Sequence, residues 1–452
     1  MDYDEALRWL LTLPDFERTG QFSARPDVAP MLALLTALGE PHRGRPTLHI
    51  AGSKGKGSTA AIAASILHAA GRHTGCYISP HLHRFTERLR IDGASIDPSD
   101  FADAMTAVRD AMPAVAAQFP GREFVAFDAL TAAAFVAFRE AGIDAQVIEV
   151  GLGGLLDSTN VFQRDDAASR DAHVSAITSI SLEHTAVLGS TIPEIAEQKA
   201  GIIVSGDTVV VAPMRESALD AVRDRARAQS ARVVEVAQSC QIARTSANAD
   251  GQDFKLKTPR TTYAAHLPLI GHHQLDNAAT AIIACEELAE QAGFELTAAH
   301  VRQGCGDILW PGRLEVLKRR PLVVIDGAHN ADSAKRMVAA LREYLGLTHA
   351  VFLVGTLNDK DITGIAEAVA PMAQQIFASA WPNRRAADPA SVAAAFRACE
   401  VPVTAFPSLP TACDAALSEA GERGAVVAFG AVSFAAAVRE YLLGIQSDIL
   451  HS

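Results

Sequence analysis

The stretch His49-Ile-Ala-Gly-Ser-Lys-Gly-Lys-Gly-Ser-Thr59 decides how the first part of this chain folds. A short apolar run over Thr47–Ala51 leads into a glycine-rich turn, and an alanine-rich helical pattern over Ala60–Ala70 follows directly. Strand, glycine turn and helix together can bind a polyphosphate, because backbone N–H groups of the turn and the positive end of the helix dipole meet the anion. The stretch therefore predicts a site for a nucleoside triphosphate.

Side chains in this turn support that interpretation. Lys56 can reach the terminal phosphates, and the hydroxyl of Ser58 or Thr59 can hold Mg²⁺. The turn is shorter than the strict P-loop pattern, since Ile50 stands where that pattern needs its first glycine. The alternative is an ordinary glycine-rich turn between a strand and a helix, which rarely carries a lysine and two hydroxyls at these offsets.

Composition narrows the class of protein. A length of 452 residues indicates two or three domains, and a net charge of −12 argues against a general nucleic-acid binder. The six cysteines are scattered without a Cys-x-x-Cys pair, which is typical of free thiols in a reducing cytosol. The acidic N-terminus lacks a signal-peptide pattern, and no apolar run approaches the roughly 20 residues of a membrane span. We expect a soluble cytoplasmic protein with no nucleic-acid or membrane partner.

The rest of the chain alternates strand-like and helical runs, which predicts an α/β fold with a mainly parallel sheet covered on both faces. The expected strands of the first series are Thr47–Ala51, Thr74–Ile78, Ala145–Val150, His173–Ile180 and Asp207–Ala212, and its longest expected helix is Gln274–Ala292. A second series has expected strands at Leu322–Ile325, His349–Val354, Gln375–Ala378 and Ala425–Phe429, with a helix over Ala331–Leu345. The glycine-rich segment Gly304–Gly312 joins the series, so we place two domains at 1–309 and 310–452. The polar segment Ser239–Thr262 predicts a small antiparallel excursion.

Polar residues follow several expected strands. Glu149 ends an apolar strand and precedes glycines, and ligands collect beyond the carboxyl ends of strands in open α/β sheets. Its carboxylate is therefore placed to face Mg²⁺, the alternative being a helix cap or a surface carboxylate. His184 follows another strand and could bind a second metal, although a lone histidine is more often structural.

Further motifs contain residues suited to substrate contacts. Ser79-Pro-His-Leu-His83 follows a strand, and we interpret its histidines as loop residues that line a pocket rather than as zinc ligands. Gly271–Asn277, Trp310–Arg313 and Val324–Asn330 carry the other polar motifs. An aspartate can bond a ribose hydroxyl and an arginine can neutralise a transferring phosphate. Their grouping around the expected linker predicts that the second domain closes over a nucleotide held by the first.

Taken together, these blocks resemble the folylpolyglutamate synthase and dihydrofolate synthase family of the Mur ligase superfamily, from the phosphate loop to Gly430-Ala-Val-Ser433. The resemblance implies a P-loop-type first domain, a smaller Rossmann-like second domain and a monomer. It implies an ATP-dependent ligase acting on a folate or dihydropteroate and L-glutamate. In that chemistry a folate carboxylate attacks the γ-phosphate of ATP, and the amine of L-glutamate attacks the resulting acyl phosphate.

The resemblance also implies a role for individual residues. ATP would be bound by Ser53, Lys54, Gly55, Lys56, Gly57, Ser58, Thr59, Asn277, Arg313, Asp326 and His329. One Mg²⁺ would be held by Ser58 or Thr59, Ser79 and Glu149, and a second by His184. Catalysis would rest on Lys56, His184 and Lys199, the last carbamylated and thus converted from a cation into a carboxylate-like group. The substrate would contact Ser79, His81, Phe127, Asp157 and Ser433.

This chain departs from the family pattern at several positions. Leu155 stands where an arginine is usual, Lys54 where bacterial members often have asparagine, and Glu183 where aspartate is usual, while Asp15–Gly20 matches the early folate-contact loop only loosely. Two alternatives remain open. A cell-wall precursor ligase would share the fold and the ATP chemistry, and a P-loop ATPase switch would have a standard phosphate loop without a clasp from a second domain.

Overall fold

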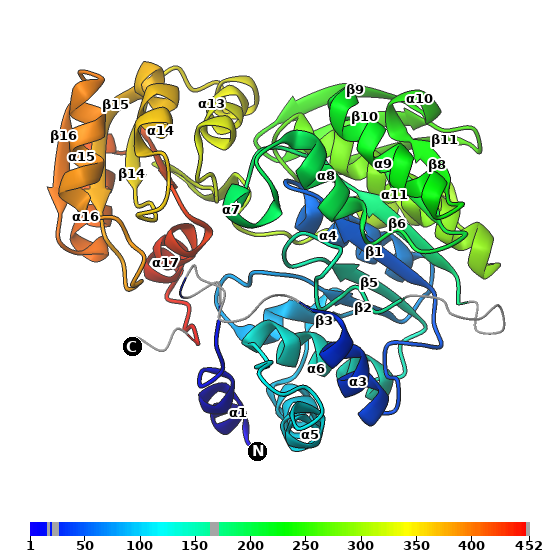
Figure 1. Ribbon diagram of the computed structural model, residues 1–452. Helices are drawn as coiled ribbons and strands as arrows, with labels where there is room; N and C mark the ends of the chain where they lie inside the picture. Colours follow the sequence, from blue (N-terminus) through cyan, green and yellow to red (C-terminus); the bar gives the residue numbers. More distant parts are fainter. Residues whose placement is uncertain (16–18, 20–26, 163–170, 449–452) are drawn as a thin grey trace.

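The computed structural model describes residues 1–15, 19, 27–162 and 171–448, and within them eight strands form one large sheet (Figure 1). The strands are β1 (Thr47–Ala51), β2 (Thr74–Tyr77), β3 (Leu89–Ile91), β4 (Ala94–Ser95), β5 (Ala145–Glu149), β6 (His173–Ile177), β7 (Thr208–Val211) and β8 (Arg232–Glu235). Their order is β4-β3-β2-β5-β1-β6-β7-β8, and all pairs are parallel except those at the β3–β4 edge. The carboxyl ends of the parallel strands therefore share one edge, where ligands bind in such folds.

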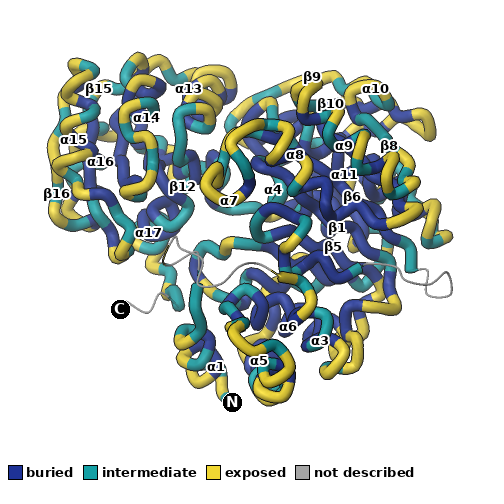
Figure 2. Tube along the Cα trace, in the orientation of Figure 1, coloured by how far each residue is buried: buried dark blue, intermediate teal, exposed yellow. Residues whose placement is uncertain are grey.

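Helices cover both faces of this sheet, so the central strands are buried throughout (Figure 2). Successive strand residues point to opposite faces: Leu48 and Ile50 pack against one set of helices, and Ala51 against another. The first set is α4 (Lys56–Ala69), α11 (His273–Ala292) and α12 (Ala298–Gly306). The opposite face carries α8 (Ile192–Ala200) and α9 (Glu216–Ala228), with α1 (Tyr3–Leu10), α3 (Ala29–Ala37), α5 (Pro98–Ala116) and α6 (Ala126–Glu140) further along. Burial on both faces explains the apolar runs in the sequence.

A small antiparallel sheet is added where the polar segment Ser239–Thr262 predicts one. It consists of β9 (Gln241–Asn248), β10 (Gly251–Lys257) and β11 (Thr262–Leu267). Alternate residues of β10, among them Phe254 and Leu256, are buried against the core that contains α4 and α11. Two short helices, α7 (Thr185–Leu188) and α10 (Val236–Ser239), lie in the connections around β6 and β8.

The second series of elements builds a separate six-stranded sheet in the order β12-β13-β17-β14-β15-β16. Its strands are β12 (Glu315–Arg319), β13 (Leu322–Ile325), β14 (Ala350–Val354), β15 (Ala373–Ser379), β16 (Val403–Phe406) and β17 (Ala425–Phe429). Helices α13 (Ala331–Leu345), α14 (Ile362–Val369) and α15 (Pro389–Ala398) pack on one face, and α16 (Leu409–Ala420) and α17 (Val432–Leu443) on the other. Apart from the antiparallel β12, the sheet is parallel.

We call residues up to 306 the first lobe, residues 307–314 the linker and residues from 315 the second lobe, drawn yellow to red in Figure 1. The end of the second lobe contacts the first. His83 Nδ1 lies 2.9 Å from Glu440 Oε1, and the carboxylate of Asp448 accepts hydrogen bonds from the Tyr3 hydroxyl and from Phe85 N–H (3.0 Å). These contacts fix the lobes on either side of the linker.

The structure differs from the sequence prediction in a few bounds. The helix after the phosphate loop begins at Lys56 rather than at Ala60, and β6 ends at Ile177 rather than at Ile180. His184 therefore lies seven residues beyond its strand and precedes the short helix α7. The placement of the domain boundary at 309/310 stays a prediction. Among the described residues, we find no helix of the length and hydrophobicity that a membrane crossing requires.

Candidate nucleotide and ligation site

The phosphate loop sits at the carboxyl end of β1 and is held in place by neighbouring strands. Gly55 precedes α4 with φ of +90°, a conformation that side chains disfavour. The carbonyl of Ser179, just beyond β6, accepts hydrogen bonds from the N–H groups of Ser53 (2.9 Å) and Lys54 (3.3 Å). On the other side, the amide of Asn277 on α11 packs against Gly55, leaving no room there for a Cβ. The loop is thus shaped before any ligand binds.

Two lysines converge on one carbonyl beneath this loop. Lys56 Nζ and Lys199 Nζ each donate to the Gly52 carbonyl at 3.0 Å, and Lys199 also pairs with Glu183 Oε1 at 2.9 Å. Lys199 is 1% exposed. Burial lowers the pKa of its ammonium to about 8, Glu183 opposes this shift, and Lys56 adds to it. Burial also disfavours ionisation of Glu183, but the charges of Lys199 and Lys56 outweigh it and hold that pKa below its usual range.

A buried carboxylate faces the other side of the loop. Glu149 at the end of β5 is 3% exposed, and its Oε2 accepts a hydrogen bond of 3.1 Å from Ser79 N–H. Burial raises the pKa of Glu149 to about 7, against the opposing charges of Lys56 and Arg313. The Thr59 hydroxyl in the first turn of α4 is fully buried and has no hydrogen-bond partner in the described residues.

This donor set fits a magnesium ion bound partly by phosphate. Mg²⁺ is usually held by one or two carboxylates, hydroxyls, waters and substrate phosphates. Glu149 supplies the carboxylate, and Ser58, Thr59 and Ser79 supply hydroxyls. The described residues contain no group of three or more His, Cys, Asp or Glu side chains placed to hold a metal.

The linker and second lobe present their own polar groups. Asp326 directly follows β13, and its carboxylate accepts hydrogen bonds from Leu314 N–H (2.9 Å) and Ala328 N–H (2.8 Å). Burial raises the pKa of this carboxyl, and the nearby Arg313 opposes the shift. Arg313 Nη1 lies 2.8 Å from the point where a Cβ on Gly327 would be. Arg313 and Asp326, predicted from separate motifs, are thus neighbours.

One direct contact joins the phosphate loop to the second lobe. His329 Nδ1 lies 2.9 Å from the Gly327 carbonyl and therefore carries its proton, which leaves Nε2 to accept a hydrogen bond from Lys54 Nζ at 3.2 Å. Burial, and then the charge of Lys54, lower the pKa of His329 to about 4. The imidazole is thus neutral near pH 7, as this hydrogen-bond pattern requires.

Other predicted residues are engaged in local structure. Asp157 accepts from Leu152 N–H at 2.8 Å and from the Thr159 hydroxyl at 2.6 Å, and so fixes the glycine loop that follows Glu149. The ring of Phe127 packs on Gly151 in that same loop. These two residues therefore shape the loop whatever else they contact.

Three other predicted residues lie at the margin of the candidate site: His81, His184 and Ser433. His81 Nδ1 accepts a hydrogen bond of 2.8 Å from Arg88, a buried arginine that sequence reasoning did not single out. His184 is exposed at the start of α7, with φ of +46°. Ser433 lies in the first turn of α17 beside Val432, whose side chain packs against Gly327. Most of the segment 15–20 falls outside the described residues.

Sequence reasoning missed two structural supports of the site. The buried Arg88 ends a short 3₁₀ helix (Phe85–Arg88) beyond the Ser79–His83 motif, and no local signal marks it. The sequence assigns no role to Trp310, yet its ring contacts the phosphate loop at Gly57. An aromatic residue in a glycine- and proline-rich linker is a signal that could have marked it.

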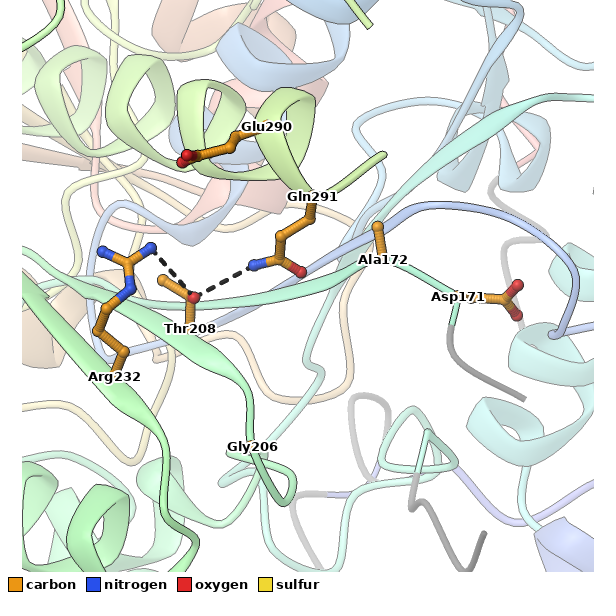
Figure 3. A pocket seen from close by; sticks show the side chains of 7 residues that line it. All are labelled: Asp171, Ala172, Gly206, Thr208, Arg232, Glu290 and Gln291. Carbon is orange, nitrogen blue, oxygen red and sulfur yellow. Dashed lines mark hydrogen bonds between the residues drawn. The ribbon is translucent and has the colours of Figure 1, made fainter. Parts of the chain in front are cut away.

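A separate surface pocket of about 590 Å³ lies at the amino ends of the strands of the large sheet, whereas the phosphate loop lies at their carboxyl ends (Figure 3). It is lined by Ala172, Thr208 and Arg232 at the amino ends of β6, β7 and β8, and by the end of α11. Arg232 and Gln291 both donate to the Thr208 hydroxyl, at 3.3 and 3.1 Å. Because the lysines and Glu149 lie beyond the carboxyl ends, this pocket is not part of the candidate site.

Comparison with known proteins places the chain among ligases. Residues 125–285 match the Mur ligase middle domain, and residues 312–432 match the glutamate ligase domain of Mur ligases. The chain is 31% identical to folylpolyglutamate synthase of Lacticaseibacillus casei over 99% of its own length and 100% of that protein. It is 35% identical to dihydrofolate synthase/folylpolyglutamate synthase of Mycobacterium tuberculosis, over 82% of this chain and 77% of the other.

A solved structure agrees over the whole chain. Mycobacterium tuberculosis folylpolyglutamate synthase, complexed with ADP and AMPPCP, superposes with a TM-score of 0.88 at 30% identity. The match covers 99% of this chain and 100% of that one. The similarity therefore includes both lobes and the linker between them.

Proposed function

This chain belongs to the folylpolyglutamate synthase and dihydrofolate synthase family of Mur ligases, and on that premise we propose that it couples the cleavage of ATP to amide formation between L-glutamate and a folate carboxylate. The carboxylate oxygen attacks the γ-phosphorus, and ADP leaves. The amine of L-glutamate then attacks the acyl carbon, inorganic phosphate leaves, and the ammonium protons pass to solvent. Phosphorylation is needed because a carboxylate oxygen is otherwise a poor leaving group.

The observation that carries this proposal is the convergence of Lys56 and Lys199 on Gly52, opposite the buried Glu149. Phosphoryl transfer depends mostly on positioning and on neutralising charge on the equatorial oxygens. Lys56 Nζ, held at the Gly52 carbonyl, would neutralise charge on the terminal phosphates. Ser53–Thr59 supply backbone N–H groups and the helix dipole on the same side.

For the metal, Glu149, Ser79 and Ser58 or Thr59 are the proposed ligands of one Mg²⁺, and His184 the proposed ligand of a second. A bound magnesium ion would neutralise charge on the phosphates and orient them. The residues themselves contribute a preformed arrangement, since Ser79 N–H already holds Glu149 Oε2. The hydroxyl of Thr59 at the same turn is buried without a hydrogen-bond partner among the described residues.

We propose that Lys199 is carbamylated in the active protein. Carbamylation requires the neutral amine, and a pKa of about 8 makes that form accessible near neutral pH. The added carboxylate would replace a buried cation by an anion beside Lys56, with Glu183 then released from its ion pair. The product is a group able to face a metal or an acyl phosphate.

The second lobe closes the nucleotide site in this proposal. Asn277, Arg313, Asp326 and His329 would contact the nucleotide from α11, the linker and the second lobe, with residues 1–309 and 310–452 as the two domains. His81, Phe127, Asp157 and Ser433 would line the space for the acceptor and L-glutamate. We further propose a cytoplasmic monomer, because no residue of the proposed site has to come from a second copy.

The test is release of inorganic phosphate with ATP, Mg²⁺ and L-glutamate, comparing 7,8-dihydropteroate with tetrahydrofolate as acceptor. Release that requires both acceptor and glutamate, with a product heavier by one glutamyl residue, supports the proposal. Activity with both acceptors identifies a bifunctional enzyme that tolerates Leu155. Nucleotide binding without glutamate-dependent release for either acceptor would overturn the assignment to folate.

A further inference from the structure

Trp310 occupies a junction that the reaction scheme does not use. It lies in the linker, after α12 ends at Gly306 and three residues before Arg313. Its side chain packs against the core of the first lobe that contains α4 and α11. A linker residue anchored in one lobe fixes where the chain leaves that lobe.

The ring of Trp310 contacts the phosphate loop itself. A Cβ added to Gly57 would lie 2.7 Å from Trp310 Cζ2, a separation that real Cβ atoms do not adopt, so the indole edge rests directly on the backbone of Gly57. A second partner is Arg90 on β3, whose guanidinium lies over the face of the ring, 5.4 Å from its centroid. The indole therefore contacts a strand of the large sheet through its face and the first turn of α4 through its edge.

The size of this ring matters more than its polarity. Trp310 Nε1 is buried and, among the described residues, has no hydrogen-bond partner. A buried unpaired donor destabilises a protein, whereas a phenylalanine or leucine would carry no such donor. Among the described residues no hydrogen bond holds the indole, so the contacts that place it are its packing against Gly57 and the guanidinium of Arg90 over its ring.

Beyond Trp310 the linker is tied to the second lobe. Gly312 N–H donates to Glu315 Oε2 at 2.8 Å, and Glu315 pairs with Arg439 on α17 at 3.1 Å. Arg313, between these anchors, lies beside Gly327 and Asp326. The segment 310–315 thus has one end against the phosphate loop and the other on the second lobe.

We propose that Trp310 is a positioning residue that sets the distance between the phosphate loop and Arg313. Its indole spaces the loop at Gly57 from the linker, so that the phosphates of a nucleotide are met at once by Lys56 and by Arg313. This inference rests on the proposed function only to the extent that the chain binds a nucleotide. Acceptor identity does not enter it.

A double-mutant cycle on ADP binding tests this inference. Gly57→Ala introduces a methyl group against the ring, and Trp310→Leu removes the ring atoms that it meets. We expect each single variant to weaken ADP binding by about tenfold and the double variant to bind better than Gly57→Ala alone, because the clash is gone. Independent effects, in which the double variant loses the product of the two single losses, would overturn the inference. Isothermal titration calorimetry gives the dissociation constants.

Trp381 provides a matched control. It is a second indole whose buried Nε1 has no partner among the described residues, and it packs on Phe434 in the second lobe, 5.2 Å between ring centroids. Trp381→Leu should lower thermal stability as Trp310→Leu does but leave the affinity for ADP within about twofold of the parent. If both leucine variants weaken ADP binding equally, Trp310 acts through general stability and the inference is wrong.

Kinetics separate positioning from folding. Trp310→Phe, which keeps an aromatic ring and shortens it, should lower kcat/KM for ATP while the KM for L-glutamate stays unchanged. Should Trp310→Phe not fold, the double variant Trp9→Phe/Trp381→Phe keeps Trp310 as the single tryptophan. Titration with ADP should then change its fluorescence, with a midpoint equal to the dissociation constant from calorimetry. Constant fluorescence during verified ADP binding would contradict the contact. If the parent chain binds no ADP, the proposed function fails first.

Discussion

Lys199→Met is the most informative substitution at the candidate site. At about pH 8, a pKa of about 8 leaves about half of the Lys199 amine neutral, whereas the ordinary value of 10.5 would leave about 0.3%. Burial thus raises the reactive fraction about 150-fold. CO₂ adds only to the neutral amine, so the proposed carbamylation of Lys199 depends on this fraction, and Glu183, which pairs with Lys199 Nζ, is the group that the modification would displace.

We expect Lys199→Met to lose at least about 99% of the activity, since removal of one group that stabilises a developing charge typically lowers kcat about 100-fold to 1,000-fold. The variant should still fold, because methionine fills a similar apolar volume, although Glu183 loses its partner. Phosphate release is the assay, with and without short carboxylic acids. An acid that fits the space left by the carbamate should restore part of the activity.

Incubation of the parent protein with ¹³C-labelled bicarbonate supplies a second readout. A carbamate carbon signal that disappears in Lys199→Met would identify the modified side chain. Full activity of Lys199→Met without added acid would refute the reasoning. Loss of activity with no carbamate signal in the parent would retain Lys199 as a cation and refute its carbamylation.

Three further predictions concern the same site. Lys56→Ala should abolish turnover and weaken ADP binding while the circular dichroism spectrum is retained. If this variant still ligates glutamate, Lys56 does not have the proposed role in the phosphate loop. Burial raises the folded-state pKa of Glu149 to about 7, above the ordinary 4.5, so this carboxyl keeps its proton to a higher pH in the folded protein than in the unfolded chain. Without metal, the stability that this difference provides is therefore lost as pH rises through 7. The affinity for Mg²⁺ should rise over the same pH range, and thermal melts of Glu149→Gln with and without Mg²⁺ should show neither the loss of stability nor the gain in affinity. Asp326→Ala leaves two N–H groups unpaired and should destabilise the protein by about 2–4 kcal/mol in urea denaturation, with an unchanged midpoint as the contrary result.

Much of the fold could be predicted because the strands are apolar on both faces. Four elements have the bounds expected from the sequence, because glycine, proline or a polar residue flanks each of them: β1, β13, α13 and β17. The sequence pattern predicts that the helix after the loop starts at Ala60, because Lys56 and Gly57 look like part of the glycine-rich turn. In the structure α4 begins four residues earlier, at Lys56, so the last residues of the turn are also the first residues of the helix. Short edge strands such as β3 and β4 have no pattern that marks them.

The residues at strand ends could be predicted for a general reason. Glu149 is the last residue of the apolar strand β5 and Asp326 directly follows the apolar strand β13, and parallel strands place such residues at the carboxyl edge of each sheet. The pairing of Lys54 with His329 could not be predicted, because 275 positions separate them and only the packing of the two lobes joins them. The same holds for Trp310 and Gly57, whose contact depends on where the linker crosses α4.

The central claim is that a folate carboxylate is activated as an acyl phosphate. The most direct measurement uses an acceptor whose carboxylate carries ¹⁸O, with ATP, Mg²⁺ and L-glutamate, and follows the label by mass spectrometry of the released phosphate. The account predicts one ¹⁸O atom transferred to inorganic phosphate for each amide formed, together with ADP. Unlabelled phosphate, or AMP and pyrophosphate as products, would contradict it.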